Sequence, residues 1–89
     1  MGGFLDAAAA FGKVLRRLRV EAGLTQEQLG FEADLRRTYV SILELGQQQP
    51  SLTTILKIAK ALNCPSGDLV TLVEAEMNSA PRKRVKQPK

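Results

Sequence analysis

The sequence predicts an all-α fold: a compact domain of five short helices with a basic tail behind it. Apolar residues recur at three- and four-residue spacing along residues 5–77, which is the period of an α-helix. Residues that begin or end helices interrupt this pattern several times, and no useful length alternates as a strand does. We therefore expect one domain over residues 1–79 and a separate tail over residues 80–89.

The first helix is expected to run from about residue 5 to residue 22. The alanines of residues 7–10 favour a helix through their intrinsic propensity. Gly23 then suits the left-handed conformation that commonly follows the end of a helix. The apolar stripe of this helix consists of Phe11, Val14, Leu15, Leu18 and Ala22.

A capping box predicts where the second helix begins. The Thr25 hydroxyl can accept a hydrogen bond from the backbone N–H of Gln28, whose side chain can reach back. We expect this helix to reach about Ala33, a turn at residues 34–35, and a third helix over residues 36–45. Two short helices joined by a tight turn, within about residues 25–45, form a helix-turn-helix.

Two further helices are expected after a polar loop. Ser51 can cap a fourth helix, and Pro65 separates it from a fifth helix over about residues 66–77. The stripe of the fourth helix consists of Leu52, Ile55, Leu56, Ala59 and Leu62.

The apolar residues of the fifth helix spread more widely than one core face requires. Surplus apolar surface on a small domain usually marks an interface. We therefore predict a homodimer that forms through this helix; the alternative is that these residues all pack inside the monomer. The residues expected at the interface are Leu69, Val70, Val73 and Met77.

The third helix divides into two faces, because successive residues lie about 100° apart around a helix. Val40 and Leu43 fall on the side that docks against the other helices. The opposite face lies near the N-terminus of the helix, which is the end that enters the major groove in helix-turn-helix proteins. The residues on that face are Arg37, Thr38, Ser41 and Ile42.

The chemistry of this outward face suits base pairs. Arg37 can form two hydrogen bonds with guanine, and Ile42 can contact the methyl group of thymine. Thr38 and Ser41 are short side chains that donate or accept. Arg36 precedes the first turn and is better placed for a phosphate.

Several motifs of residues 16–62 occur in one order and spacing, and together they resemble the Cro and lambda-repressor helix-turn-helix proteins, or XRE family. The motifs are Arg19 four residues before Gly23, the run Gly23–Leu29, the run Arg37–Ser41, Glu44 with Gly46, and Pro50–Leu52 leading into Ile55–Ala59. The resemblance implies a five-helix, lambda-repressor-like domain that binds specific DNA sequences, usually as a dimer on a pseudo-palindromic operator.

The resemblance also implies roles for single residues. Gln26 matches the position that clamps a DNA phosphate, and Arg19 and Glu44 match an ion pair that ties the first helix to the third. Tyr39 either joins the core or lies along the DNA backbone. The residues expected to contact phosphates are Thr25, Gln26, Arg36, Tyr39, Gln47 and Gln48.

The chain departs from the family pattern at four positions. Asp34 occupies the tight turn where glycine is usual, and Gly30 stands where alanine is common. Gly30 allows close approach but costs about 1 kcal/mol of helix propensity. Ile42 and Leu45 are apolar where polar residues are frequent, which indicates either readout of T-rich DNA or a surface that contacts protein.

The function that these patterns favour is a transcriptional repressor or autoregulatory controller. Phage repressors and the controller proteins of restriction–modification systems both fit. The alternatives are an antitoxin of a toxin–antitoxin pair, or a protein-interaction module that kept the fold and lost specific DNA binding. A regulatory protein partner is a further possibility.

Composition excludes several other classes. The chain has one cysteine and no histidine, so it can form neither an intramolecular disulfide nor a Cys/His zinc site, and it lacks histidine acid–base chemistry. We expect no enzyme activity, no cofactor and no metal, and a reducing, cytoplasmic setting. No apolar run approaches the length of a membrane span, so we expect no membrane partner.

The net charge of +4 is concentrated at one end. Five of the 13 basic residues lie in residues 80–89, leaving eight basic against nine acidic residues in residues 1–79. A short basic segment without apolar periodicity is expected to be disordered. The tail is a solvated extension, an arm that binds DNA phosphates or, from its Pro-Arg-Lys-Arg run alone, a nuclear-import signal.

Overall fold

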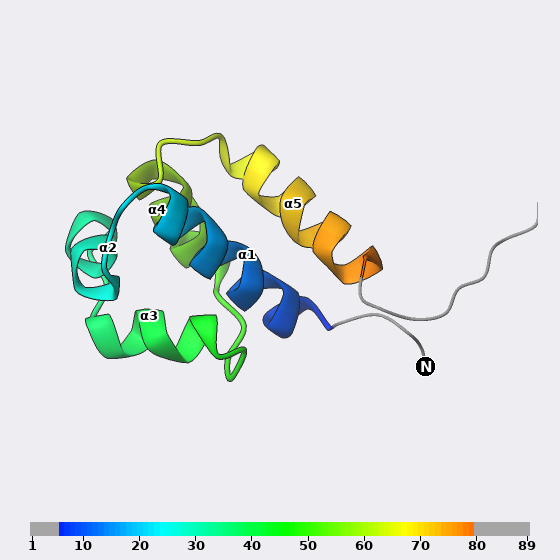
Figure 1. The fold of residues 1–89 in the computed structure, drawn as a ribbon, viewed down its shortest axis with the longest axis horizontal. Coiled ribbons are helices and arrows are strands. Elements are labelled where there is room, and N and C mark those ends of the chain that lie inside the picture. The colour runs from blue at the N-terminus through cyan, green and yellow to red at the C-terminus, as the bar shows by residue number, and fades with distance from the viewer. Residues whose placement is uncertain (1–5, 80–89) are drawn as a thin grey trace, which may run out of the picture.

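The computed structural model describes residues 6–79, which form five α-helices, and no strand occurs among them (Figure 1). This confirms the predicted all-α fold. The first helix begins at Ala7, two residues later than the predicted start near residue 5, because Asp6 is extended and caps it. The basic tail at residues 80–89 lies outside the described residues. The helices are α1 (Ala7–Glu21), α2 (Gln26–Ala33), α3 (Arg37–Glu44), α4 (Leu52–Ala61) and α5 (Ser66–Asn78).

Side-chain caps define where three of the helices begin. The Asp6 carboxylate accepts a hydrogen bond from the Ala9 N–H at 2.8 Å and so caps α1, in addition to the caps that the sequence predicts. The predicted capping box of α2 is present in both directions, and Ser51 caps α4. Gly23 and Gly46 adopt the left-handed conformation after α1 and α3, as expected for residues that follow helix ends.

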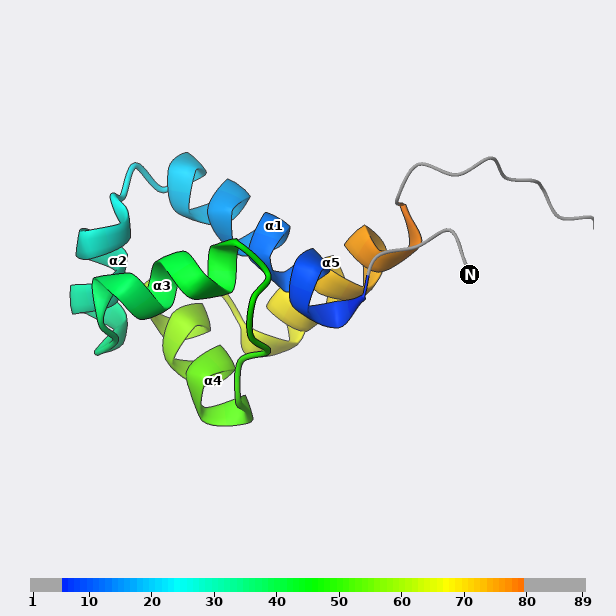
Figure 2. The ribbon, with the colours of Figure 1, turned by 90° about the horizontal axis from the view of Figure 1, so that it is seen from below.

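The helices enclose one apolar core, and α1 lies at its centre. Helix α1 packs against α3 on one side and α5 on another, while α2 packs against α3 and α4. Figures 1 and 2 both show α1 and α5 side by side, with α3 on the opposite side of α1. The fully buried large side chains are Val14, Leu15, Leu29, Val40, Leu43, Ile58 and Leu69.

A glycine sets the distance between α1 and α3. A Cβ atom on Gly12 would lie 2.5 Å from the Leu43 carbonyl oxygen and 2.6 Å from that of Glu44. These distances are too short for any larger residue, so the backbones of α1 and α3 touch directly. This contact fixes how far α3 projects from the core.

The predicted core face of α4 is right for Ile55, Ala59 and Leu62, which pack in or against the core, and wrong for two leucines. Leu52 and Leu56 are 71% and 49% exposed, whereas Thr54, Ile58 and Ala59 are buried. Helix α4 packs against both α2 and α5, so its buried face is set by two neighbours. Two leucines assigned to the core therefore lie on the surface.

The helices of residues 6–79 are too short or too polar for any of them to cross a lipid bilayer.

Candidate nucleic-acid interface

The turn between α2 and α3 has the tight geometry predicted from the sequence. Asp34 adopts the left-handed conformation, with φ 59° and ψ 49°, and so replaces the usual glycine. The Leu35 N–H donates to the Gly30 carbonyl at 2.7 Å, which closes the turn. A Cβ atom on Gly30 would lie 2.6 Å from the Leu35 carbonyl oxygen. Glycine at position 30 therefore lets the chain leave α2 and enter α3 with only three residues between them.

Helix α3 buries the face that the sequence predicts and exposes the other. Val40 and Leu43 have no exposed surface. Figure 2 shows α3 at the front of the molecule, on the side turned away from α5. On the outward side, Arg36, Arg37 and Thr38 are exposed, and Ser41 and Ile42 are partly exposed. The side chains expected to read bases thus share one accessible surface at the start of α3.

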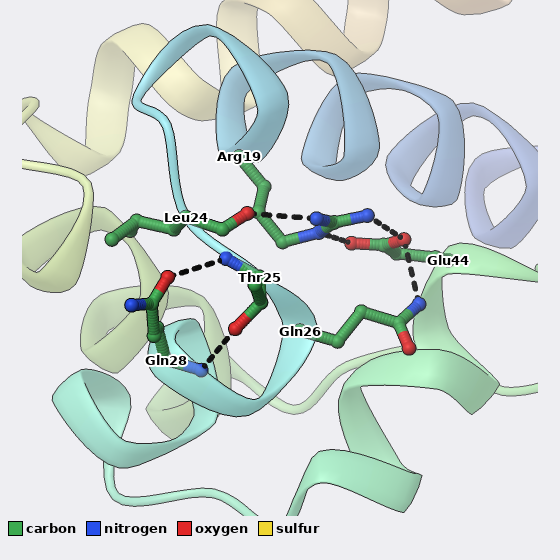
Figure 3. A network of polar contacts seen from close by, with 6 residues as sticks. All are labelled: Arg19, Leu24, Thr25, Gln26, Gln28 and Glu44. Atoms are coloured by element: carbon green, nitrogen blue, oxygen red, sulfur yellow. Dashed lines mark hydrogen bonds and ion pairs between the residues drawn. The ribbon is translucent and has the colours of Figure 1, made fainter.

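An ion pair ties α3 to α1, as the family resemblance implies (Figure 3). Arg19 Nε lies 2.5 Å from Glu44 Oε2, and Arg19 Nη2 lies 3.0 Å from Glu44 Oε1. Arg19 Nη1 also donates to the Leu24 carbonyl at 2.8 Å, just before α2 begins. Hydrogen bonding to Glu44 raises the pKa of Arg19 above its ordinary value, although burial alone would lower it. Arg19 therefore stays charged, and its hydrogen bonds hold three segments together.

Gln26 belongs to the same network, a contact that the sequence does not reveal. Its amide Nε2 donates to Glu44 Oε1 at 3.0 Å (Figure 3). The position expected to clamp a phosphate is thus held by the last turn of α3. No spacing rule connects residues 26 and 44, so only the tertiary structure could show this bond.

The N-terminus of α2 and the start of α3 meet in a shallow hollow. Thr25, Gln26 and Arg37 line it, together with Arg19, Leu24 and Glu27. The first N–H groups of a helix have no partners inside the helix and favour anions. The structure therefore brings together two predicted phosphate contacts and one predicted base contact.

The other predicted phosphate contacts lie elsewhere. Gln47 and Gln48 are exposed in the loop after α3, and Arg36 is exposed at the N-cap position of α3. Tyr39 is partly buried and packs against the core, which leaves part of its side chain at the surface.

The predicted dimer residues of α5 divide into two groups. Leu69 has no exposed surface, so its assignment to an interface is wrong: it completes the core against the other helices. Val70 is 49% exposed, and Val73 and Met77 are partly buried. These three line an apolar cleft that is completed by Ala7, Phe11, Gln49, Pro50, Ile55 and Glu74.

The position of single cations, and not the net charge, makes part of the described surface positive. All eight basic residues outside the tail and all nine acidic residues lie within residues 6–79, so this part has a slight negative charge. Arg36 and Arg37 nevertheless stand together at the exposed start of α3. Attraction of DNA to this surface thus depends on where the cations lie.

Comparison with known proteins identifies the family. A family model described as helix-turn-helix matches residues 15–69. Control protein C.BamHI of Bacillus amyloliquefaciens is 44% identical over 61 residues, which are 67% of this chain and 75% of that protein. The immunity repressor protein of Bacillus phage phi105 is 35% identical over 80 residues, covering 83% of this chain and 56% of the repressor.

A solved structure shares the fold. The crystal structure of the restriction-modification controller protein C.AhdI from Aeromonas hydrophila superposes with a TM-score of 0.68. The sequence identity is 45%, and the match covers 70% of this chain and 94% of that one. The chain therefore belongs to the helix-turn-helix family of DNA-binding transcriptional regulators, as its resemblance to the XRE proteins implies.

Proposed function

We propose that this protein is a repressor or autoregulatory controller that binds a pseudo-palindromic operator as a dimer through the major groove. The observation that carries the proposal is the outward face at the start of α3. Its exposed polar side chains stand opposite a fully buried pair, Val40 and Leu43, so the helix has one face for the core and one for DNA. A cytoplasmic location belongs to the same proposal.

In this proposal, the start of α3 reads the bases. Arg37 forms a bidentate contact with a guanine, and Thr38 and Ser41 hydrogen-bond to neighbouring base edges. Ile42 is partly exposed one turn further along and contacts a thymine methyl group.

Phosphates are held on both sides of α3. Thr25 and Gln26 contribute from the N-terminus of α2, where unpaired backbone N–H groups favour an anion. The remaining phosphate contacts are Arg36, Tyr39, Gln47 and Gln48. Such contacts fix the orientation of the protein without reading sequence.

The second copy is proposed to pack against α5 and the exposed face of α4. Val70, Val73 and Met77 line an apolar cleft together with Ile55 of α4. Leu52 and Leu56 are exposed on α4, the helix that contributes Ile55 to the cleft, and the proposal places them in the interface as well. Two subunits joined there would present two α3 helices to successive major grooves, which lie about 34 Å apart on one side of B-DNA.

Among regulators, we favour a controller of a restriction–modification system. The relatives include control protein C.BamHI and controller protein C.AhdI, at 44% and 45% identity. The phage repressor is more distant, at 35% identity. An antitoxin role, a protein-interaction module and a regulatory protein partner stay alternative hypotheses.

Two substitutions test the proposal. Arg37→Ala should weaken binding to the DNA upstream of the gene by about 1–3 kcal/mol and relax sequence preference. Gln26→Ala should weaken binding to this DNA and to a random duplex by similar factors, because it removes a phosphate contact. Fluorescence titration with both duplexes measures the two effects.

Lys13→Ala serves as the control, because it removes an exposed cation from α1, outside both the proposed DNA contacts and the proposed dimer surface. Its affinity for both duplexes should match that of the unmodified protein. Equal affinity of all four proteins for upstream and random DNA would instead support the protein-interaction module.

A further inference from the structure

The Glu44 carboxylate is a buried hub at the end of α3. Its side chain is only 3% exposed, yet it accepts three hydrogen bonds on two oxygens. Arg19 provides two of them and Gln26 the third, both from helices that precede α3 in the chain (Figure 3). We propose that Glu44 is a positioning residue for DNA binding, which holds the Gln26 side chain in place before DNA arrives. This inference rests on the proposed function, in which Gln26 contacts a phosphate.

The acceptor chemistry of Glu44 fixes the orientation of the Gln26 amide. A carboxylate can only accept hydrogen bonds, so the NH2 end of the amide, and not its oxygen, turns toward Glu44. An NH2 group has two N–H donors, and Glu44 uses one of them. The second is left for another acceptor, and a phosphate oxygen at the start of α2 is such an acceptor.

Arg19 makes this arrangement compatible with a bound phosphate. An unpaired carboxylate beside the site would repel an anion. The guanidinium of Arg19 neutralises Glu44 through two hydrogen bonds at 2.5 and 3.0 Å. It also holds the Leu24 carbonyl at 2.8 Å, next to the residue that caps α2. The same network thereby places the helix N-terminus and the Gln26 side chain relative to α3.

The benefit is preorganisation. A free glutamine side chain loses rotamer freedom when it binds, and that entropy opposes association. Here the side chain is already ordered in the folded protein. In contrast, Gln47 and Gln48 are exposed in a loop, and no hydrogen bond links either side chain to the described residues. Of the three glutamines proposed to contact phosphate, only Gln26 has a side chain that a hydrogen bond within the described residues already holds in place.

A double-mutant cycle tests the coupling, with a short duplex of arbitrary sequence at low salt as the probe. Gln26→Ala should weaken binding about tenfold, the loss of one hydrogen bond to a charged group. Glu44→Gln should weaken binding several-fold, because it replaces one of the two acceptor oxygens with an NH2 group that faces donors, so the three hydrogen bonds cannot all be kept. In the Gln26→Ala background, Glu44→Gln should add less than about a twofold loss, since coupled residues are non-additive.

Gln47→Ala provides the matched control. This glutamine is also proposed to contact phosphate but has no bond to Glu44, so Glu44→Gln should keep its full effect in that background. An equal effect of Glu44→Gln in all three backgrounds would overturn the inference and leave Glu44 a purely structural role. Failure of the unmodified protein to bind any duplex would instead overturn the proposed function.

A second measurement needs no substitution and so does not depend on a variant that folds. In DNA-free protein, NMR relaxation of side-chain amides should show the Gln26 NH2 group as rigid and those of Gln47 and Gln48 as mobile. A Gln26 amide as mobile as the other two would contradict the inference, whatever the protein binds.

Discussion

At the scale of single residues, Gly30 is a position where helix propensity and tertiary packing favour different residues. Helix propensity alone favours alanine there by about 1 kcal/mol. A methyl group at this position would, however, meet the Leu35 carbonyl oxygen at 2.6 Å. The clash is with backbone, which cannot rotate away, so the tertiary constraint is larger than the local gain.

Gly30→Ala is therefore expected to destabilise the protein by about 1–3 kcal/mol, as overpacking does. Gly67→Ala is the matched comparison, because α5 leaves open space around that position. It should stabilise the protein by up to about 1 kcal/mol through helix propensity. Urea unfolding of both variants measures the free energies; stabilisation by Gly30→Ala would disprove the proposed clash.

Cys64 is a residue whose chemistry is set by its surroundings. Burial raises the pKa of its thiol above the ordinary value, and the negative charge of Asp68 adds to the effect. The thiolate is the nucleophile, and a raised pKa keeps the thiol protonated at neutral pH.

Alkylation of Cys64 should thus be slow near pH 7.5 and should accelerate only at a higher pH than for an exposed cysteine peptide. The protonated Cys64 thiol contributes to the free energy of unfolding below the pKa of the unfolded chain, and this contribution is lost as pH rises through the raised pKa of the folded protein. Iodoacetamide kinetics across pH measure the alkylation rates. A rate profile identical to that of the peptide would show that the fold does not protect the thiol.

At the scale of helices, α4 shows why periodicity alone misplaces a buried face. Its sequence offers apolar residues around more than half of the helix, among them Leu52, Leu56 and Ile58. Contact with α2 and α5 selects the face that contains Ile58 and leaves the two leucines outside. If the proposed dimer includes α4, contact with the second copy gives the exposed leucines a reason to be apolar.

Leu52→Ser combined with Leu56→Ser should separate dimers into monomers without lowering monomer stability, since both side chains are already about half exposed or more. Sedimentation velocity gives the oligomeric state, and chemical unfolding gives the stability. Phe31→Ser is the control, because Phe31 is 84% exposed on α2, which is not part of the proposed dimer surface of α4 and α5. Dissociation by the control, or an unaltered dimer in the double variant, would place the interface elsewhere.

At the scale of the whole molecule, the positive charge is concentrated in the last ten residues of the chain. Residues 1–79 have one more acidic than basic residue, while residues 80–89 have five basic residues and no acid. A nearly neutral domain gains little from long-range attraction to DNA. The tail is the segment of the chain that can supply it.

Removal of residues 80–89 should therefore reduce the slope of log K against log salt for DNA binding. Each lost phosphate contact lowers that slope by about one, because fewer counterions are released. Titrations at several salt concentrations, with and without the tail, give the two slopes. Identical slopes would mean that the tail is only a solvated extension.

The sequence by itself determined the five helices, the capping box of α2, the turn at Asp34 and the two faces of α3. These depend on contacts within a few residues along the chain, such as the Thr25–Gln28 cap, and on a periodicity of 3.6 residues. Family motifs added the Arg19–Glu44 pair, which joins residues 25 positions apart.

Only the tertiary structure decided which apolar residues are buried. It placed Leu69 in the core and Leu52 on the surface, and it joined Gln26 to Glu44. The physical reason is that burial and hydrogen bonding depend on distance in space. Several rotations of a short helix bury similar apolar area, and only packing against its neighbours selects one of them.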